Sequence, residues 1–358
     1  MTREKLAKKI SLGHKTAESA IEKLFADKQL SRDFILQTGG RGPITFYSNG
    51  KLKMNFDAKS FSLHRNARNQ ICSRFGIPQK YIQTLTELGD EGRMLASFIF
   101  NKHNEFAPGK RQLVRAVSDE VRGVLSDHYR RLDAYSIIKS FVDSGVSCGG
   151  YPVDGLYTDT RLFVELLHPD PVIINTPKNG DVVMAFGSRL STSDYGDGAL
   201  DLRFFMMQGV CLNGMVMESV MRQVHLGKKL PANLALSERT YRLDSETTAS
   251  AISDLTRDLF STERIKKHIE AIQAASSESV DAKAELIKRY KAGELYKGEV
   301  EEIENALLNE NPADGIFGES TIWKISQGIS AFARDADPER SRELQDIAGN
   351  MVAKTLKV

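Results

Sequence analysis

The chain has 358 residues, of which 41% are hydrophobic, so it is long enough to form one large or two ordinary domains. No uninterrupted apolar run approaches the ~20 residues of a membrane-spanning helix, and no apolar segment follows the basic N-terminal residues. These features predict a soluble cytoplasmic protein without a membrane segment. The cysteines Cys72, Cys148 and Cys211 are far apart and form no CxxC pair, which predicts free thiols in a reducing compartment.

The net charge of +2 hides an uneven distribution along the chain. Residues 1–140 contain 25 Lys and Arg against 14 Asp and Glu, whereas residues 141–358 contain 24 against 33. A basic N-terminal part suits a polyanionic partner, and an acidic C-terminal part does not. Many proteins with a basic surface bind no nucleic acid, so charge alone leaves the partner open.

The first 59 residues are expected to form an N-terminal extension. Apolar residues at helical spacing, such as Ala17, Ile21 and Leu24, predict a helix over residues 1–36. The glycines of TGGRG then interrupt the helix, and a short strand is expected before a Ser-Asn-Gly turn. This glycine segment lacks the Gly-Lys-Ser/Thr of a Walker loop, so a connector is favoured over a phosphate cradle.

Two short helices are predicted next. Residues 63–75 carry one apolar stripe, and Arg65 and Arg68 lie off it. Gly76 is expected to end this helix, and Pro78 to open the second one. Such a pair is compatible with a DNA-reading helix-turn-helix. The second helix has few side chains that read bases, so packing is the favoured interpretation.

Residues 111–125 alternate in polarity on both sides of Ser118-Asp119-Glu120, which predicts a β-hairpin. Ser126-Asp127 is expected to cap the helix that follows. Four arginines and a tyrosine crowd this region: Arg115, Arg122, Arg130, Arg131 and Tyr129. Guanidinium groups clamp phosphates, and an aromatic ring can stack on a base, so the region is a candidate nucleic-acid site. The alternative is a solvated hairpin face with a buried tyrosine.

The rest of the chain predicts the fold class. Strands are expected at residues 161–168, 181–190 and 200–207, without helices between them, which is typical of an antiparallel sheet. From Ser245 onward, amphipathic patterns predict a helical C-terminal region. We therefore expect an α+β fold, mainly antiparallel sheet with flanking helices. The expected divisions are an extension (1–59), a core (60–245) and a helical region (246–358).

No catalytic constellation emerges from the residues. There is no GxSxG elbow, no HExxH and no paired-carboxylate signature. Cys211 and His225 are compatible with a thiol–imidazole pair in which Asn213 or Asp194 orients the imidazole. With a carboxylate they are also compatible with a metal site, but two such ligands at this spacing are a weak signal. Cys211 ends an apolar strand, where cysteine is usually a small core residue, and Asn213-Gly214 is typical of a turn. We expect no metal, no cofactor and no catalytic residue.

Three sequence blocks carry a resemblance to a known family. They are ARNQICSRFGIPQKYIQTL (67–85), RAVSDEVRGVLSDHYRRLD (115–133) and SDYGDGAL with VCLNGMVMESVMRQVHLG (193–227). In order and spacing they resemble the phage- and plasmid-borne family known as domain of unknown function 932. The resemblance covers roughly residues 60–230. It implies a component of a mobile element, for which replication or recombination is the usual role.

These observations lead to one functional hypothesis and two alternatives. The hypothesis is a self-associating protein that binds single-stranded DNA and anneals strands, which requires a basic groove and no catalytic residue. The expected nucleic-acid contacts are Arg65, Arg68, Arg115, Arg122, Tyr129, Arg130, Arg131, Arg203, Arg222, His225, Lys228 and Lys229. The alternatives are an interaction or scaffold protein, such as a modulator of host defence, and an enzyme centred on Asp194, Asn213 and His225.

Overall fold

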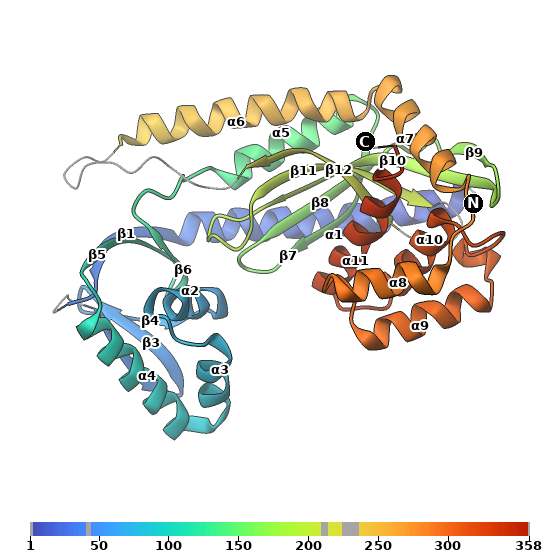
Figure 1. Ribbon diagram of the computed structural model, residues 1–358. Coiled ribbons are helices and arrows are strands. Elements are labelled where there is room, and N and C mark those ends of the chain that lie inside the picture. The colour runs from blue at the N-terminus through green and yellow to red at the C-terminus, as the bar shows by residue number, and fades with distance from the viewer. Residues whose placement is uncertain (1–2, 41–43, 209–213, 224–235, 357–358) are drawn as a thin grey trace.

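The structure, a computed structural model, describes residues 3–40, 44–208, 214–223 and 236–356. These residues form two lobes, each built on its own sheet (Figure 1). Both sheets are mostly antiparallel, and a series of helices follows residue 238, which confirms the predicted α+β fold class. None of the described helices has both the length and the apolar character needed to cross a membrane.

The sheet of the first lobe has strand order β1-β5-β6-β4-β3-β2. Its strands are β1 (Ser31–Thr38), β2 (Thr45–Asn49), β3 (Lys51–Phe56), β4 (Lys59–Leu63), β5 (Lys110–Val117) and β6 (Glu120–Ser126). Strands β4 and β6 pair in parallel, and the other neighbours pair antiparallel. The β5–β6 pair is the predicted hairpin, and Ser118 adopts the left-handed conformation, with φ of 52°, in its turn.

Three helices cover one face of this sheet: α2 (Arg65–Phe75), α3 (Gln79–Glu87) and α4 (Gly89–Phe106). Apolar residues of these helices, including Ile71, Ile82 and Phe100, are buried against Met54 and Val114 of the sheet. Helix α2 ends at a glycine in position 76 with φ of 67°, the left-handed conformation that favours glycine at a helix end. The predicted pair of short helices is therefore confirmed.

The sheet of the second lobe has strand order β12-β11-β10-β8-β7, and β9 pairs with β10 beside this path. Its strands are β7 (Tyr151–Tyr157), β8 (Leu162–Leu167), β9 (Val172–Thr176), β10 (Gly180–Thr192), β11 (Leu200–Gln208) and β12 (Gly214–Gln223). All the described pairs are antiparallel. Strand β11 is buried along nearly its whole length because apolar residues pack on both of its faces.

Helices surround this second sheet (Figure 1). Helix α1 (Arg3–Leu30) runs along the edge strand β7, and α5 (Ala134–Ser147) packs side by side with α6 (Glu238–Leu259). The remaining helices are α7 (Thr262–Ala275), α8 (Ala282–Lys291), α9 (Lys297–Leu308), a 3-10 turn (Pro312–Asp314), α10 (Ile322–Ala333) and α11 (Pro338–Ala353). Trp323 of α10 lies fully buried in this lobe's core.

Two predicted helix limits are wrong. The first helix ends at Leu30 rather than at residue 36, because residues 31–38 pair with β5 as strand β1. The helix expected after Ser126-Asp127 begins only at Ala134, where the Asp133 side chain accepts a hydrogen bond from the backbone N–H of Tyr135. Residues 127–133 instead cross from the first lobe to the second. In both cases contacts with distant segments override the local pattern: strand pairing for residues 31–38, and side-chain bonds such as Arg130 with Asp244 for residues 127–133.

The sheets do not follow the expected divisions of the chain. The first sheet combines strands from residues 31 to 126, so it crosses the limit expected at residue 59. The limit expected at residue 245 falls inside α6. Cys72 and Cys148 are free thiols, as predicted, and burial raises the pKa of the Cys72 thiol to about 11. Cys211 lies outside the described residues.

Candidate functional site

The loop of residues 193–199, here called the junction loop, joins β10 to β11 where the two lobes meet. Asn66 and Gln70 of α2 both donate side-chain hydrogen bonds to the carbonyl oxygen of Tyr195, at 2.9 and 2.8 Å. The Gln70 side chain also accepts from the backbone N–H of Val124 in β6, at 2.7 Å. Amide side chains of α2 therefore fix the junction loop to the first lobe.

The β5–β6 hairpin and the segment after it contact the same loop. Arg115 Nη1 donates to the carbonyl oxygen of Asp194 at 2.5 Å, and the Tyr129 hydroxyl donates to that of Ser193 at 3.1 Å. A Cβ atom at Gly123 would approach the Tyr195 carbonyl oxygen to 3.1 Å, so glycine lets the loop pass closely over β6. Residues of all three sequence blocks thus meet at the junction loop: Gln70 of the first, Arg115 and Tyr129 of the second, and residues 193–195 of the third.

The hairpin arginine Arg115 is held by acidic partners. Its Nε donates to Asp33 Oδ1 of β1 at 2.9 Å, and its guanidinium lies 5.8 Å from the centre of the Tyr195 ring. Burial would lower the pKa of Arg115, but the charges of Asp33 and Asp194 raise it above its ordinary value. Arg115 therefore stays charged and links strand β1 to the junction loop.

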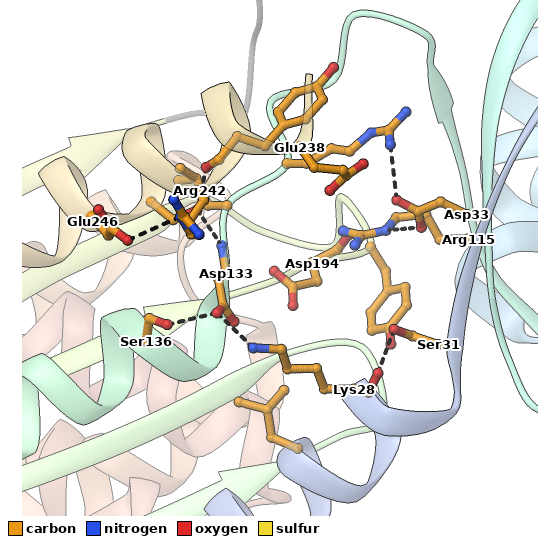
Figure 2. Close-up of a pocket in the computed structure, with 16 residues that line it drawn as sticks. Lys28, Ser31, Asp33, Arg115, Asp133, Ser136, Asp194, Glu238, Arg242 and Glu246 are labelled. Carbon is orange, nitrogen blue, oxygen red and sulfur yellow. Dashed lines mark hydrogen bonds and ion pairs between the residues drawn. The ribbon is translucent and has the colours of Figure 1, made fainter. Parts of the chain in front are cut away.

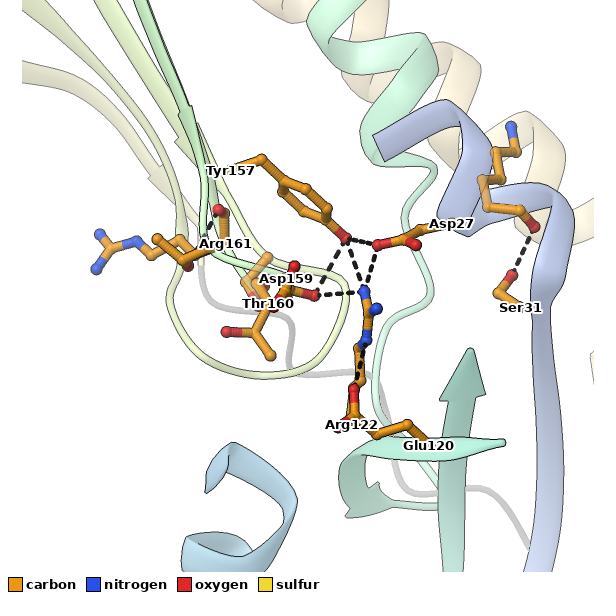
Figure 3. Close-up of polar contacts among 11 residues, drawn as sticks. Asp27, Ser31, Glu120, Arg122, Tyr157, Asp159, Thr160 and Arg161 are labelled. Carbon is orange, nitrogen blue, oxygen red and sulfur yellow. Dashed lines mark hydrogen bonds and ion pairs between the residues drawn. The ribbon is translucent and has the colours of Figure 1, made fainter. Parts of the chain in front are cut away.

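Arg122 is likewise enclosed by partners from the second lobe (Figure 3). Its Nη1 bonds to the carboxylate of Asp27 in α1 and donates to the carbonyl oxygen of Asp159 at 3.0 Å. Its Nε donates to Glu120 Oε2 at 3.2 Å. The Tyr157 hydroxyl donates to Asp27 Oδ2 at 2.8 Å, which completes the cluster. The Arg122 side chain is only 12% exposed, so it acts as a bridge between the lobes.

Three further arginines have acidic partners. Arg130 Nε donates to Asp244 Oδ2 of α6 at 2.6 Å, and a second nitrogen bonds to the other carboxylate oxygen. Arg131 lies 3.4 Å from Asp33 Oδ2 and 5.1 Å from the centre of the Tyr241 ring. Arg203 bonds to Asp201 at 2.7 Å and to Asp346 of α11 at 2.9 Å.

The arginines expected to clamp phosphates at the hairpin are thus engaged inside the fold. Tyr129 is 9% exposed and packs with Leu113 and Leu125, which agrees with the alternative of a buried tyrosine. In this arrangement its ring does not offer a stacking surface for a base. The arginines do lie in one region, as the sequence predicted. In the structure the guanidinium groups of Arg115, Arg122 and Arg130 bond to residues of the other lobe or of the junction loop.

The other expected contacts lie elsewhere. Arg65 opens α2 with an exposed side chain, and Arg68 Nη1 donates to Thr86 Oγ1 at 3.2 Å. Arg222 is exposed on β12, opposite Asp201 in the strand register. The expected contacts His225, Lys228 and Lys229 lie outside the described residues, as does Asn213 of the enzyme alternative.

A polar groove runs over α2 and α3 beside the junction loop. One part, of about 770 Å³, lies between α2, the end of β6 and the loop. A second part, of about 430 Å³, lies between α2 and α3, and Asn69 and Gln79 line both. We call their union the amide groove. Its principal polar side chains are Asn66, Asn69, Gln70, Ser73, Arg74, Gln79, Arg65, Lys80 and Gln83.

The exposed cations of the amide groove are Arg65 and Lys80. Neither side chain forms an ion pair or hydrogen bond with another described residue. The Asn69 side-chain amide, between the two parts of the groove, also has no hydrogen-bond partner among the described residues. Gln79 Nε2 donates to Ser73 Oγ at 3.1 Å. Arg65 was expected to contact nucleic acid, whereas Lys80 and the amides were not. Their only signal in the sequence is that they are polar residues on the predicted helices.

A second hollow, of about 570 Å³, lies on the other side of the junction loop, between α1, β5 and α6 (Figure 2). Five acidic and four basic side chains line this interlobe pocket. Most of them pair with one another. Lys28 Nζ, for example, donates to Asp133 Oδ2 at 2.7 Å, and Arg242 lies 3.5 Å from Glu246.

Asp194 and Glu238 are the acidic side chains of this pocket that have no ion pair among the described residues, and of the two Asp194 is the buried one. Its carboxyl group points into the middle of the pocket, between Asp133 and Arg115 (Figure 2). Its Oδ1 is buried and has no hydrogen-bond partner among the described residues. Burial raises the pKa of Asp194 to about 6, although Arg115 opposes the shift. A carboxyl group with this pKa can accept or release a proton near neutral pH.

No group of His, Cys, Asp and Glu among the described residues has the arrangement that would hold a metal ion. Comparison of the chain with protein-family models, with curated proteins and with solved structures finds no match.

Proposed function

We propose that this protein binds single-stranded nucleic acid in the amide groove. The observation that carries the proposal is the pair of exposed, unpaired cations, Arg65 and Lys80, beside the free amide of Asn69. Cations on a groove wall attract a phosphate backbone, and the association releases counterions. The basic balance of residues 1–140 supports the same partner, because a polyanion is drawn to this lobe.

The groove lining favours a single strand over a duplex. An amide side chain offers both a donor and an acceptor, so Asn69 and Gln79 can bond to the edges of different bases. In a duplex these edges are engaged in pairing, whereas in a single strand they are free. Amides therefore suit binding with little base preference.

Strand annealing is the extension of this proposal. It requires binding of one backbone and no reaction centre. The resemblance of the three blocks to the domain-of-unknown-function 932 family supports a role in replication or recombination of a mobile element. The meeting of these blocks at the junction loop supports treating the amide groove as part of the same site.

The direct test is a fluorescence anisotropy titration with a labelled single-stranded oligonucleotide and the matching duplex. The two phosphate contacts of Arg65 and Lys80 should lower the single-strand affinity roughly sevenfold between 50 and 200 mM salt. We expect the duplex to bind more weakly at both salt concentrations. Salt-independent binding, or no binding of either substrate, would contradict the proposal. Mixing complementary labelled strands then measures annealing.

The buried Oδ1 of Asp194 supports a second candidate, an enzymatic activity in the interlobe pocket. This candidate predicts that incubation changes the mass of an oligonucleotide, and that Asp194→Asn abolishes the change without weakening binding. Mass spectrometry of the oligonucleotide after incubation distinguishes the two candidates. An unchanged mass with wild-type protein would contradict an enzymatic action on nucleic acid.

A further inference from the structure

Helix α4 carries an exposed apolar stripe on its outer face. Leu95 is 45% exposed and Phe98 58%, and Leu88, just before the helix, is 67% exposed. The opposite face is buried, with Ala96 and Phe100 fully inside the first lobe. Figure 1 shows α4 on the outer side of this lobe, away from the second lobe. Single exposed apolar residues are ordinary, but several on one helix face form a patch that suits a partner.

The spacing along this stripe is that of a helix–helix seam. Leu88, Glu91, Leu95, Phe98 and Lys102 follow one another at intervals of three and four residues. All five are exposed. The stripe is therefore acidic near its start, apolar in its middle and basic near its end. We call it the α4 stripe.

We infer that the α4 stripe packs against the α4 stripe of a second copy of this chain, with the two helices antiparallel. A two-fold axis level with residues 96 and 97 places Leu95 opposite the second copy's Phe98. The same axis places Glu91 opposite the second copy's Lys102. Each contact occurs twice, because a two-fold interface uses the same surface of both copies.

Charge complementarity selects this orientation. In a parallel pairing each Glu91 would face another Glu91, and each Lys102 another Lys102, which is repulsive. In the antiparallel pairing both ends of the seam are attractive. Lys102 already lies on the stripe, since its Nζ is 6.0 Å from the centre of the Phe98 ring and 2.9 Å from Glu105 Oε2. Lys102 can therefore reach the second copy's Glu91 while its side chain remains along the α4 stripe.

The expected dimer is weak and reversible. A single helix pair is smaller than the roughly 1,600 Å² of a standard stable interface, so we expect a dissociation constant in the micromolar range. This inference does not depend on nucleic-acid binding. It is measured on the full chain alone, without any oligonucleotide.

Sedimentation velocity over a concentration series from about 1 to 200 µM tests the inference. Wild-type protein should shift from monomer to dimer. Phe98→Glu places two charges in the apolar seam and should raise the dissociation constant more than about 100-fold. Phe98 is exposed in the monomer, so circular dichroism and the melting temperature should stay unchanged. A wild-type protein that stays monomeric, or a Phe98→Glu variant that still dimerises, would overturn the inference.

A charge exchange tests the antiparallel register and does not rely on Phe98→Glu. Glu91→Lys alone and Lys102→Glu alone should each weaken the dimer roughly 10-fold, because an attraction becomes a repulsion at both ends. The double variant restores the attraction and should return within about threefold of wild type. Glu22→Lys on the exposed face of α1 is the matched control and should change nothing. Failure of the double variant to recover would overturn the antiparallel pairing.

Discussion

Two pairs of basic side chains in the first lobe have different surroundings. At the lobe junction, Arg115 and Arg122 are 14% and 12% exposed and bond to carboxylates of other elements. Along the amide groove, Arg65 and Lys80 are exposed and form no ion pair with another described residue. The chemistry of the two pairs is the same, but only the second pair is available to a ligand.

The comparison shows that a cluster of arginines in a sequence has two possible meanings. A buried guanidinium must be paired, and its partners can come from anywhere in the chain. The Asp27 carboxylate that holds Arg122 comes from a helix 95 residues earlier. Cations that serve a ligand are better recognised by the absence of such partners than by their density in the sequence.

The largest effect should follow from breaking a junction pair. Arg115→Ala leaves Asp33 without its closest cation and removes the bond to the junction loop. Loss of one partner of a largely buried ion pair should lower the free energy of unfolding by about 3 kcal/mol. Urea denaturation followed by circular dichroism measures this. The matched control, Arg65→Ala, should change stability by less than about 0.5 kcal/mol. Equal destabilisation by both variants would contradict the comparison.

A smaller effect should come from Asp194, which faces Arg115 across the pocket edge. The pKa of Asp194 is raised to about 6 in the folded protein, above its ordinary value of 3.8. Between these values the folded state binds the proton and the unfolded state does not, so stability falls as pH rises from about 4 to about 6. At pH 7 the loss is nearly complete, and there Asp194→Asn should raise stability by up to about 3 kcal/mol.

The pH series separates this effect from a general change in packing. Urea denaturation of wild type and Asp194→Asn at pH 4, 5, 6 and 7 should show two curves that diverge as pH rises. At pH 4 the wild-type carboxyl group is protonated in the folded protein, and the two proteins should have similar stability. A constant difference at every pH would show that Asp194 does not titrate in this range.

Much of the fold could be predicted because its signals are local. The apolar stripe that ends at Phe75 and the left-handed glycine in position 76 both belong to one helix and its end. Strand β1 could not be predicted in the same way, since its partner β5 lies more than 70 residues later. The cap expected at Ser126-Asp127 was wrong because the chain crosses between the lobes there, and Asp133 caps the helix instead.

The candidate site was predictable only in part. The three blocks indicated which segments matter, and they do meet at the junction loop. Ion pairs between distant residues, such as Arg130 with Asp244, decide which side chains of each block can reach a ligand. The spacing of residues in the sequence does not reveal such pairs. The amides Asn69 and Gln79 carry no charge and no motif, so only the groove itself identifies them.

The most direct test of the central claim is the salt dependence of binding by the Arg65→Ala/Lys80→Ala double variant. A labelled single-stranded oligonucleotide is titrated at several salt concentrations, in parallel with wild-type protein and a Lys288→Ala/Lys291→Ala control. Loss of two phosphate contacts should weaken binding about 10-fold at low salt and reduce the slope of log affinity against log salt by about 1.4. A double variant that binds like wild type, with an unchanged slope, would contradict the assignment of the amide groove.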